Sequence, residues 1–205
     1  MTTNIHFILD RSGSMDSFIQ DTIGGFNSFI RSQKEINTDK CIFSLYQFDH
    51  DYQVIYTDKD IKEVEDLNEH TFVPRGTTAL YDAIGRTINN VSQNKYNNDD
   101  KIIIVILTDG IENSSVEYSN KSISKLIKKY DTNNNWSFVF LAANQDAIIS
   151  AGKLGIRGKS SMTFSQNSEK IHQCYSNLSS AVKRVRMTPI ITKMLFTDEE
   201  QSNAQ

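Results

Sequence analysis

Three short stretches of this 205-residue chain place carboxylates and hydroxyls directly after or before strongly apolar segments. Residues 10–14 read D-R-S-G-S and follow the apolar run Ile5–Leu9. Residues 75–80 read R-G-T-T-A-L and open a helical pattern, and residues 107–110 read L-T-D-G and end the most apolar run of the chain. The first stretch alone has ordinary explanations, because aspartate and serine also form turns and helix caps. Together the three indicate a polar ligand site.

The chemistry of these stretches favours a hard divalent cation. Helices that follow parallel strands begin at the carboxyl ends of those strands, where ligands of open α/β sheets bind. The candidate groups that converge there are all oxygen donors, namely Asp10, Ser12, Ser14, Asp109 and a threonine at 77 or 78. Mg²⁺ prefers oxygen ligands and keeps several waters. We therefore predict a Mg²⁺ site, with Mn²⁺ or Ca²⁺ as alternatives, and no zinc site.

The apolar segments that must position these groups have the spacing of a doubly wound α/β fold. Strands are expected at Ile5–Leu9, Cys41–Phe48, Ile102–Leu107 and Trp136–Leu141, with room for helices between most of them. The run 102–107 lacks polar alternation, which is typical of a central parallel strand covered on both faces. The short turn 49–51 suits only a hairpin, so the strand from Tyr52 is predicted to be an antiparallel edge strand.

The regions between the strands show helical periodicity. Helices are predicted over 18–30, 80–91, 123–130 and 171–185, with a short helix at 146–154 and a sixth strand near 161–164. Gly24 and Gly25 are costly inside a helix, and we expect them to permit close packing against the sheet. We predict one domain over residues 1–187 and a tail over 188–205. The apolar tail residues either dock on this domain or bind a partner or a second copy.

Composition excludes several classes of protein. With 38% hydrophobic residues the chain can form a single core, and its net charge of −3 argues against a nucleic-acid partner. The basic clusters at 125–129 and 183–186 are expected on solvated helix faces. No apolar run approaches the roughly 18 residues of a membrane span. Cys41 and Cys174 are expected to be reduced core residues, and the N-terminus shows no secretory signal, so we predict a cytoplasmic protein.

The arrangement of the three stretches resembles that of the von Willebrand factor A family with its metal-ion-dependent adhesion site. That family has D-x-S-x-S after the first strand, a threonine before the next major helix and T-D-G after the fourth strand. The segment 79–84, A-L-Y-D-A-I, resembles the family's stretch after its threonine and selects Thr78. The resemblance covers most of the chain and is strongest to stand-alone intracellular bacterial and phage members, judging from L-D-R-S-G-S-M at 9–15 and I-G-G-F-N at 23–27.

The resemblance implies a mostly parallel six-stranded sheet of the Rossmann-like type. It also implies a metal held by Asp10, Ser12, Ser14, Thr78 and Asp109, whose open coordination position takes a glutamate or aspartate from a partner protein. We expect loops at the same end of the sheet to shape specificity through Met15, Asp49, His50, Arg75, Tyr81, Glu112, Asn113 and Asn144. The predicted function is therefore a Mg²⁺-dependent protein-interaction module and not an enzyme.

Other functions fit the sequence less well. A Mg²⁺-dependent phosphatase of the haloacid-dehalogenase type needs D-x-D after its first strand, and Ser12 cannot act as the acid or base. A serine hydrolase needs G-x-S-x-G, and a dinucleotide site needs G-x-G-x-x-G. The four histidines are expected to be structural or exposed. The remaining alternative is a metal-independent scaffold of the same fold.

Overall fold

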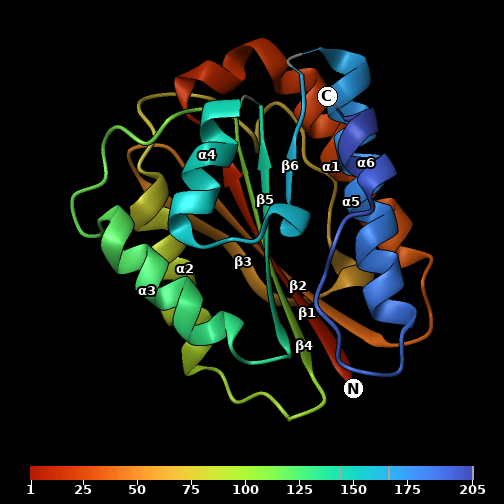
Figure 1. Cartoon of the computed structure of the whole chain (residues 1–205). Coiled ribbons are helices and arrows are strands. Elements are labelled where there is room, and N and C mark those ends of the chain that lie inside the picture. The colour runs from red at the N-terminus through yellow and green to blue at the C-terminus, as the bar shows by residue number, and fades with distance from the viewer. Residues whose placement is uncertain (144, 166, 205) are drawn as a thin grey trace.

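The computed structural model describes residues 1–143, 145–165 and 167–204. Within them the chain forms one six-stranded sheet in the order β3-β2-β1-β4-β5-β6 (Figure 1). Only β2 and β3 pair antiparallel, which confirms the predicted fold class and the antiparallel edge strand. The strands are β1 Thr2–Asp10, β2 Lys40–Phe48, β3 Tyr52–Asp60, β4 Lys101–Thr108, β5 Trp136–Ala142 and β6 Ser161–Thr163.

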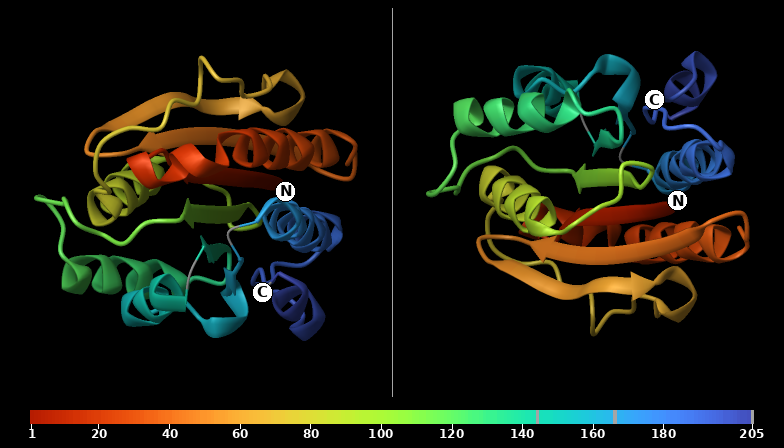
Figure 2. Two further views of the ribbon diagram at one scale, coloured as in Figure 1. Left: turned by 90° about the horizontal axis from the view of Figure 1, so that it is seen from above. Right: turned by 90° about the horizontal axis from the view of Figure 1, so that it is seen from below.

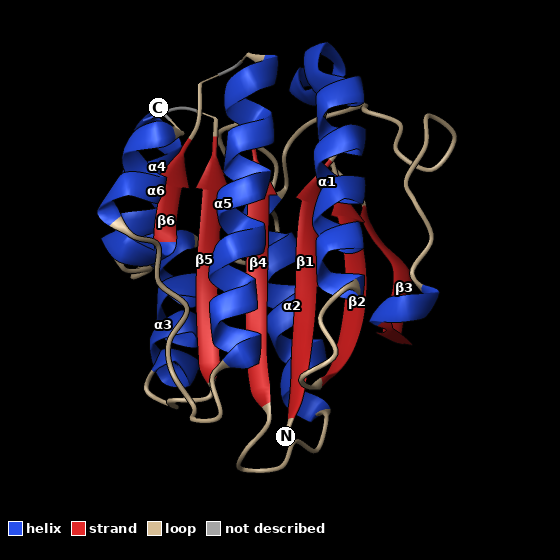
Figure 3. Cartoon of the chain, turned by 90° about the vertical axis from the view of Figure 1, so that its right-hand side faces the viewer, coloured by secondary structure: helices blue, strands red, loops and turns tan. Residues whose placement is uncertain are grey.

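Helices cover both faces of this sheet (Figures 2 and 3). One face packs against α1 and α5, and the other against α2, α3 and α4. The described helices are α1 Ile19–Lys34, α2 Leu80–Gln93, α3 Asn120–Asp131, α4 Gln145–Leu154, α5 Ser168–Met187 and α6 Asp198–Asn203, with 3-10 turns η1 Gly13–Phe18, η2 Ile61–Glu63 and η3 Gly158–Ser160. In the described part of the chain, none of the helices has the length and apolar character that crossing a membrane requires.

Two central strands bring the candidate site residues to one edge of the sheet. Every residue of β4 is buried, as expected for a strand covered on both faces. The parallel register pairs Leu9 of β1 with Leu107 of β4. Asp10 therefore ends β1 level with the end of β4, and Asp109 follows immediately.

Two residues have environments that differ from the predicted ones, and the two cysteines do not. Gly25 lies against α5 and not the sheet, because a Cβ there would be 2.1 Å from Cδ2 of Tyr175. Arg186 was expected on a solvated helix face, but its side chain is fully buried at the end of α5 and pairs with Asp39. Cys41 and Cys174 are free and buried, as predicted.

The C-terminal segment packs on the domain. Met194, Phe196 and Ala204 are buried and belong to the same apolar cluster as α1 and α5. The Met194 N–H donates to Ser137 Oγ, and the Phe196 N–H donates to the carbonyl of Lys159. Of the roles considered for this tail, docking on its own domain is the one that the structure shows.

His6 supplies a pH-dependent contribution to stability. It is buried in β1 within hydrogen-bond distance of the Tyr46 and Tyr96 hydroxyls, and burial lowers its pKa from 6.5 to about 3. Between these pKa values the unfolded chain binds a proton that the folded chain does not, so stability falls as pH decreases below 6.5. Wild type should lose about 1.4 kcal/mol per pH unit relative to His6→Gln.

The measurement is urea unfolding of both proteins between pH 5 and 7.5. The comparison with His6→Gln is needed because burial also raises the pKa of Asp10 to about 6, and a raised carboxyl pKa makes the folded state more stable as pH decreases in this range. That effect is shared by both proteins and cancels in the difference. A difference that does not change with pH would contradict the role assigned to His6.

Candidate metal centre

The loop after β1 places its carboxylate and hydroxyls close to the loop after β4. One oxygen of Asp10 accepts the Ser12 N–H at 2.6 Å, and the other accepts the Thr108 hydroxyl. The hydroxyls of Ser12 and Ser14 are 3.2 Å apart, and that of Ser14 donates to Asp109 at 2.6 Å. Four of the five predicted residues thus form one connected cluster.

Thr78 joins the same cluster from the segment before α2. A Cβ on Gly110 would lie 2.9 Å from Thr78 Oγ1 and 3.5 Å from Ser12 Oγ. Thr78 is buried, whereas Thr77 is exposed. The structure therefore brings all five predicted residues together, and a glycine at position 110 leaves room beside the Thr78 and Ser12 hydroxyls.

Hydrogen bonds in both directions join the loop after β4 to Thr78 and the start of α2. Asn113 Oδ1 accepts the Thr78 N–H at 2.9 Å, and the Asn113 N–H donates to the Thr78 carbonyl. Glu112 accepts the Tyr81 N–H, and Asp82 accepts three N–H groups from residues 116–118. Asn113 and Glu112 thus position the backbone beside the centre, and their suggested role in specificity stays a prediction.

The cluster is buried except on one side. Asp10, Ser12, Thr78 and Asp109 are buried, while Ser14 is exposed. Burial raises the pKa of Asp10 to about 6, and the charge of Asp109 adds to this effect. Burial likewise raises the pKa of the Asp109 carboxyl above its usual value. Two carboxylates are thus held together where water does not stabilise their charges.

These properties fit a hard divalent cation. The donor set is two carboxylates and three hydroxyls, which suits Mg²⁺, Mn²⁺ or Ca²⁺ and not a soft metal. A cation beside the buried carboxylates would favour their ionised forms and reverse the effect of burial. Access from the Ser14 side would leave room for water or for an external ligand.

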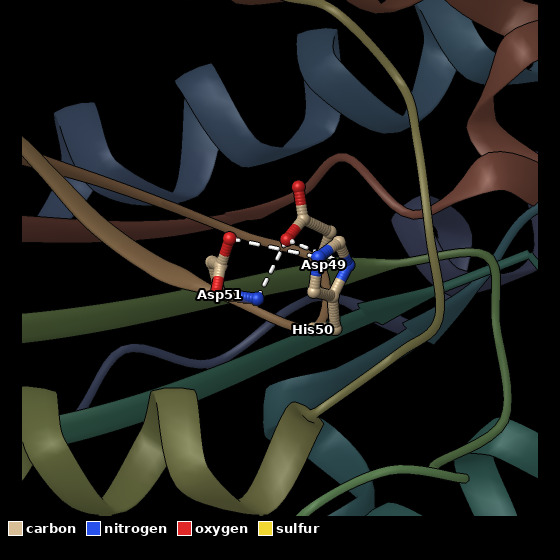
Figure 4. A group of neighbouring side chains, drawn as sticks. All are labelled: Asp49, His50 and Asp51. Atoms are coloured by element: carbon tan, nitrogen blue, oxygen red, sulfur yellow. Dashed lines mark hydrogen bonds and ion pairs between the residues drawn. The ribbon is translucent and has the colours of Figure 1, made fainter.

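A second group of possible ligands lies next to this cluster. Ligand atoms of Asp49, His50 and Asp51, in the turn between β2 and β3, lie within 4.8 Å of one another (Figure 4). The Asp49 carboxylate is already bound by two guanidiniums, that of Arg11 at 3.0 Å and that of Arg75 at 2.8 Å. These two cations oppose a metal ion at Asp49, so this group is the weaker candidate.

Asp49 instead connects the two loops that carry the hydroxyls. Arg11 precedes Ser12, Arg75 lies just before Thr78, and the Asp49 carbonyl accepts the Ala79 N–H. Although burial alone would raise the pKa of Asp49, its hydrogen bonds and the two guanidiniums hold this pKa below the ordinary value. Sequence reasoning placed Asp49 on the specificity rim and missed this role, because nothing local in the sequence pairs residues so far apart.

The other residues of the expected rim have different environments. Met15 is only 2% exposed and packs in the core, so it cannot contact a partner. The His50 ring is half exposed and lies over Gly76, whose φ of +67° requires glycine. Tyr81 is partly exposed near the centre. Asn144 lies outside the described residues.

Comparison with known proteins places this centre in context. The model of the von Willebrand factor type A domain matches residues 4–177. A search of curated proteins gave no match. Solved structures with this fold include the PilB minor pilin from Streptococcus sanguinis, with 15% identity, a TM-score of 0.67 and coverage of 91% of this chain and 62% of the pilin.

Two further structures are similar over most of this chain. Manganese-loaded TRAP protein from Plasmodium vivax has 14% identity and a TM-score of 0.59, and the match covers 93% of this chain and 74% of TRAP. Proximal thread matrix protein 1 from the mussel byssus has 17% identity and a TM-score of 0.60, with coverage of 87% and 45%. The chain thus spans about three-fifths of the pilin and less than half of the byssus protein.

At these identities the solved structures support the fold alone, and the family model is the stronger finding. It covers the D-R-S-G-S segment, Thr78 and the T-D-G segment, which the structure brings to one edge of the sheet. On the fold and on this match, the chain belongs to the von Willebrand factor type A family.

Proposed function

We propose that this protein is a metal-dependent interaction module that binds an acidic side chain of a partner protein, with Mg²⁺ as its metal. The observation that carries the proposal is the convergence of Asp10, Ser12, Ser14, Thr78 and Asp109 in one connected cluster, with the Thr78 and Ser12 hydroxyls beside Gly110. Its open side, at Ser14, is where a partner's carboxylate would approach.

The hydroxyls and the carboxylates of the centre would have different roles in metal binding. The hydroxyls of Ser12, Ser14 and Thr78 would offer neutral oxygens, while Asp10 and Asp109 would supply negative charge directly or through water. When bound, a dication held largely by neutral oxygens supplies an electrophilic position that an external carboxylate can fill. Asp10 also holds the Ser12 N–H, and Asn113 holds the Thr78 backbone, so both hydroxyls are oriented in advance.

The comparisons are consistent with this proposal. The family to which the chain belongs is one of protein-interaction modules, and one solved relative in fold is described as manganese-loaded. We further propose that the protein is not an enzyme, because Ser12 stands where a D-x-D hydrolase needs its second carboxylate. Location in the cytoplasm stays a prediction from the sequence.

Calorimetric titration with Mg²⁺ and with Mn²⁺ tests the metal centre. We expect one site in the wild type and an affinity at least about 100-fold lower in Asp10→Ala, because a buried charge is removed from the ligand set. The matched control is Asp51→Ala, which removes an exposed carboxylate from the neighbouring group and should leave the affinity unchanged. Loss of Mg²⁺ binding in Asp51→Ala but not in Asp10→Ala would contradict the proposed site and assign the metal to residues 49–51.

Partner capture tests the interaction itself. Tagged wild type and Asp10→Ala are incubated with lysate of the source organism in Mg²⁺ or in EDTA, and retained proteins are identified by mass spectrometry. We expect a partner that only the wild type retains, and only in Mg²⁺. Equal capture under all conditions would refute the metal bridge and support the metal-independent scaffold.

A further inference from the structure

A groove of about 500 Å³ lies beside the candidate metal centre. One wall is formed by η1 and the start of α1, and the other by residues 69–74, which lead into the Thr78 loop. Asp16 in the first wall is two residues after Ser14. The two walls join where the Gly13 N–H donates to the Gly76 carbonyl at 3.1 Å. The groove is thus built from the same two segments that carry Ser14 and Thr78.

The groove combines an apolar surface with acidic side chains. Ile19, Val73 and Pro74 supply the accessible apolar part, and Val73 is 51% exposed, whereas Phe72 is fully buried beneath them. Asp16, Asp21 and Glu69 supply three carboxylates. Among the residues that the structure describes, those lining the groove include no lysine or arginine. A surface of this kind is complementary to a long side chain with an apolar stem and a cationic end.

Neighbouring polar groups leave much of this negative charge uncompensated. The Asp21 carboxylate accepts the Ser168 hydroxyl at 2.6 Å and lies 3.7 Å from His172. Glu69 accepts a hydrogen bond from the neutral amide of Gln20. Arg75, just beyond the groove, binds Asp49 and Asp51 and so turns toward the β2–β3 turn. Asp16 and Glu69 are exposed and, among the described residues, form no ion pair within the chain, so both carboxylates are available to a cationic group of a partner.

We propose that this groove receives a lysine or arginine side chain of the same partner protein whose carboxylate binds the metal centre. The inference rests on the proposed function, and it adds that the partner's acidic residue has a basic neighbour. The stem of that basic residue would pack on Ile19 and Val73, and its charged end would pair with Asp16 and Glu69. The metal centre would then bind the partner's acidic residue, and the groove would favour those acidic residues that have a basic neighbour.

Selection of phage-displayed random peptides tests this pairing. The probe is a library of 12-residue peptides bound to the wild-type protein in Mg²⁺ and eluted with EDTA. We expect the eluted peptides to share an acidic residue with a lysine or arginine at a constant spacing. EDTA-sensitive peptides without such a basic residue would refute the groove and leave the metal bridge intact. Absence of any EDTA-sensitive peptide would refute both.

A charge-matched pair of variants then locates the contact. Asp16→Asn/Glu69→Gln neutralises the groove and should weaken binding of an enriched peptide about tenfold or more, as expected for loss of close charge pairs. Glu63→Gln/Glu65→Gln removes the same charge from exposed positions outside the groove and should retain the affinity. Mg²⁺ affinity, measured by calorimetry, should be unchanged in both. Equal weakening in the two variants would show a general charge effect and overturn the assignment.

Discussion

Replacing Asp49 with alanine is expected to lower the free energy of unfolding by about 3 kcal/mol, because a buried carboxylate is removed from between two guanidiniums. Asp49 is fully buried and the Arg11 side chain is only 10% exposed. Without Asp49, Arg11 keeps a single described side-chain partner, the Gln53 amide oxygen. The same change should weaken Mg²⁺ binding about tenfold, because Arg11 and Arg75 would no longer align the Ser12 and Thr78 loops.

Urea unfolding and calorimetric Mg²⁺ titration measure the two effects. The control is Asp51→Ala, since Asp51 contacts the same Arg75 but is 62% exposed. A surface carboxylate of this kind should contribute no more than about 0.5 kcal/mol. If Asp49→Ala were as stable as Asp51→Ala, the bond between the two loops would have no energetic importance.

Replacing Asp39 with alanine is expected to destabilise the protein by about 3–5 kcal/mol. The Arg186 side chain is 0% exposed and that of Asp39 is 4% exposed, and their closest atoms are 2.9 Å apart. Arg186 also donates to the Gln33 and Ile36 carbonyls, so it is held in place when its counter-ion is lost. The variant therefore leaves a buried cation without its anion.

A double-mutant cycle with Arg186→Met separates the ion pair from general packing. The double variant should be more stable than Asp39→Ala, because the unpaired cation is then replaced by an apolar side chain. Asp66→Ala provides the surface control, since its pair with Arg31 is exposed and should contribute at most about 1 kcal/mol. Additive losses in the cycle would contradict a direct pair between Asp39 and Arg186.

Local patterns in the sequence determined most of the architecture. The run 102–107 is apolar without alternation and became β4, whose faces are both covered by helices. The turn 49–51 is too short for a crossover and produced the antiparallel β2–β3 pair. The convergence of the candidate ligands was also predictable, because they stand at strand ends or helix starts that the parallel topology brings together, although the choice of Thr78 over Thr77 came from the family resemblance.

Other features depended on residues that are distant in sequence. Lys183, Arg184 and Arg186 have the same local pattern, yet Arg184 is exposed and pairs with Glu200, whereas Arg186 is buried against α1 and Asp39. Gly25 packs on Tyr175 of α5, and the tail packs against β5, η3 and α5. These outcomes follow from how α5 packs on α1 and the tail packs on the opposite side of α5, which no local pattern specifies.

Asp49, at the candidate site, shows both the part that the sequence specifies and the part that depends on distant residues. The sequence by itself determined that its turn lies beside the metal loops, since β2 runs parallel to β1 and ends at the same edge of the sheet. Only the tertiary structure decided that its carboxylate binds Arg11 and Arg75 and is buried. The physical reason is that chain periodicity specifies which face and which end a residue occupies, whereas charge pairing depends on which distant side chains meet there.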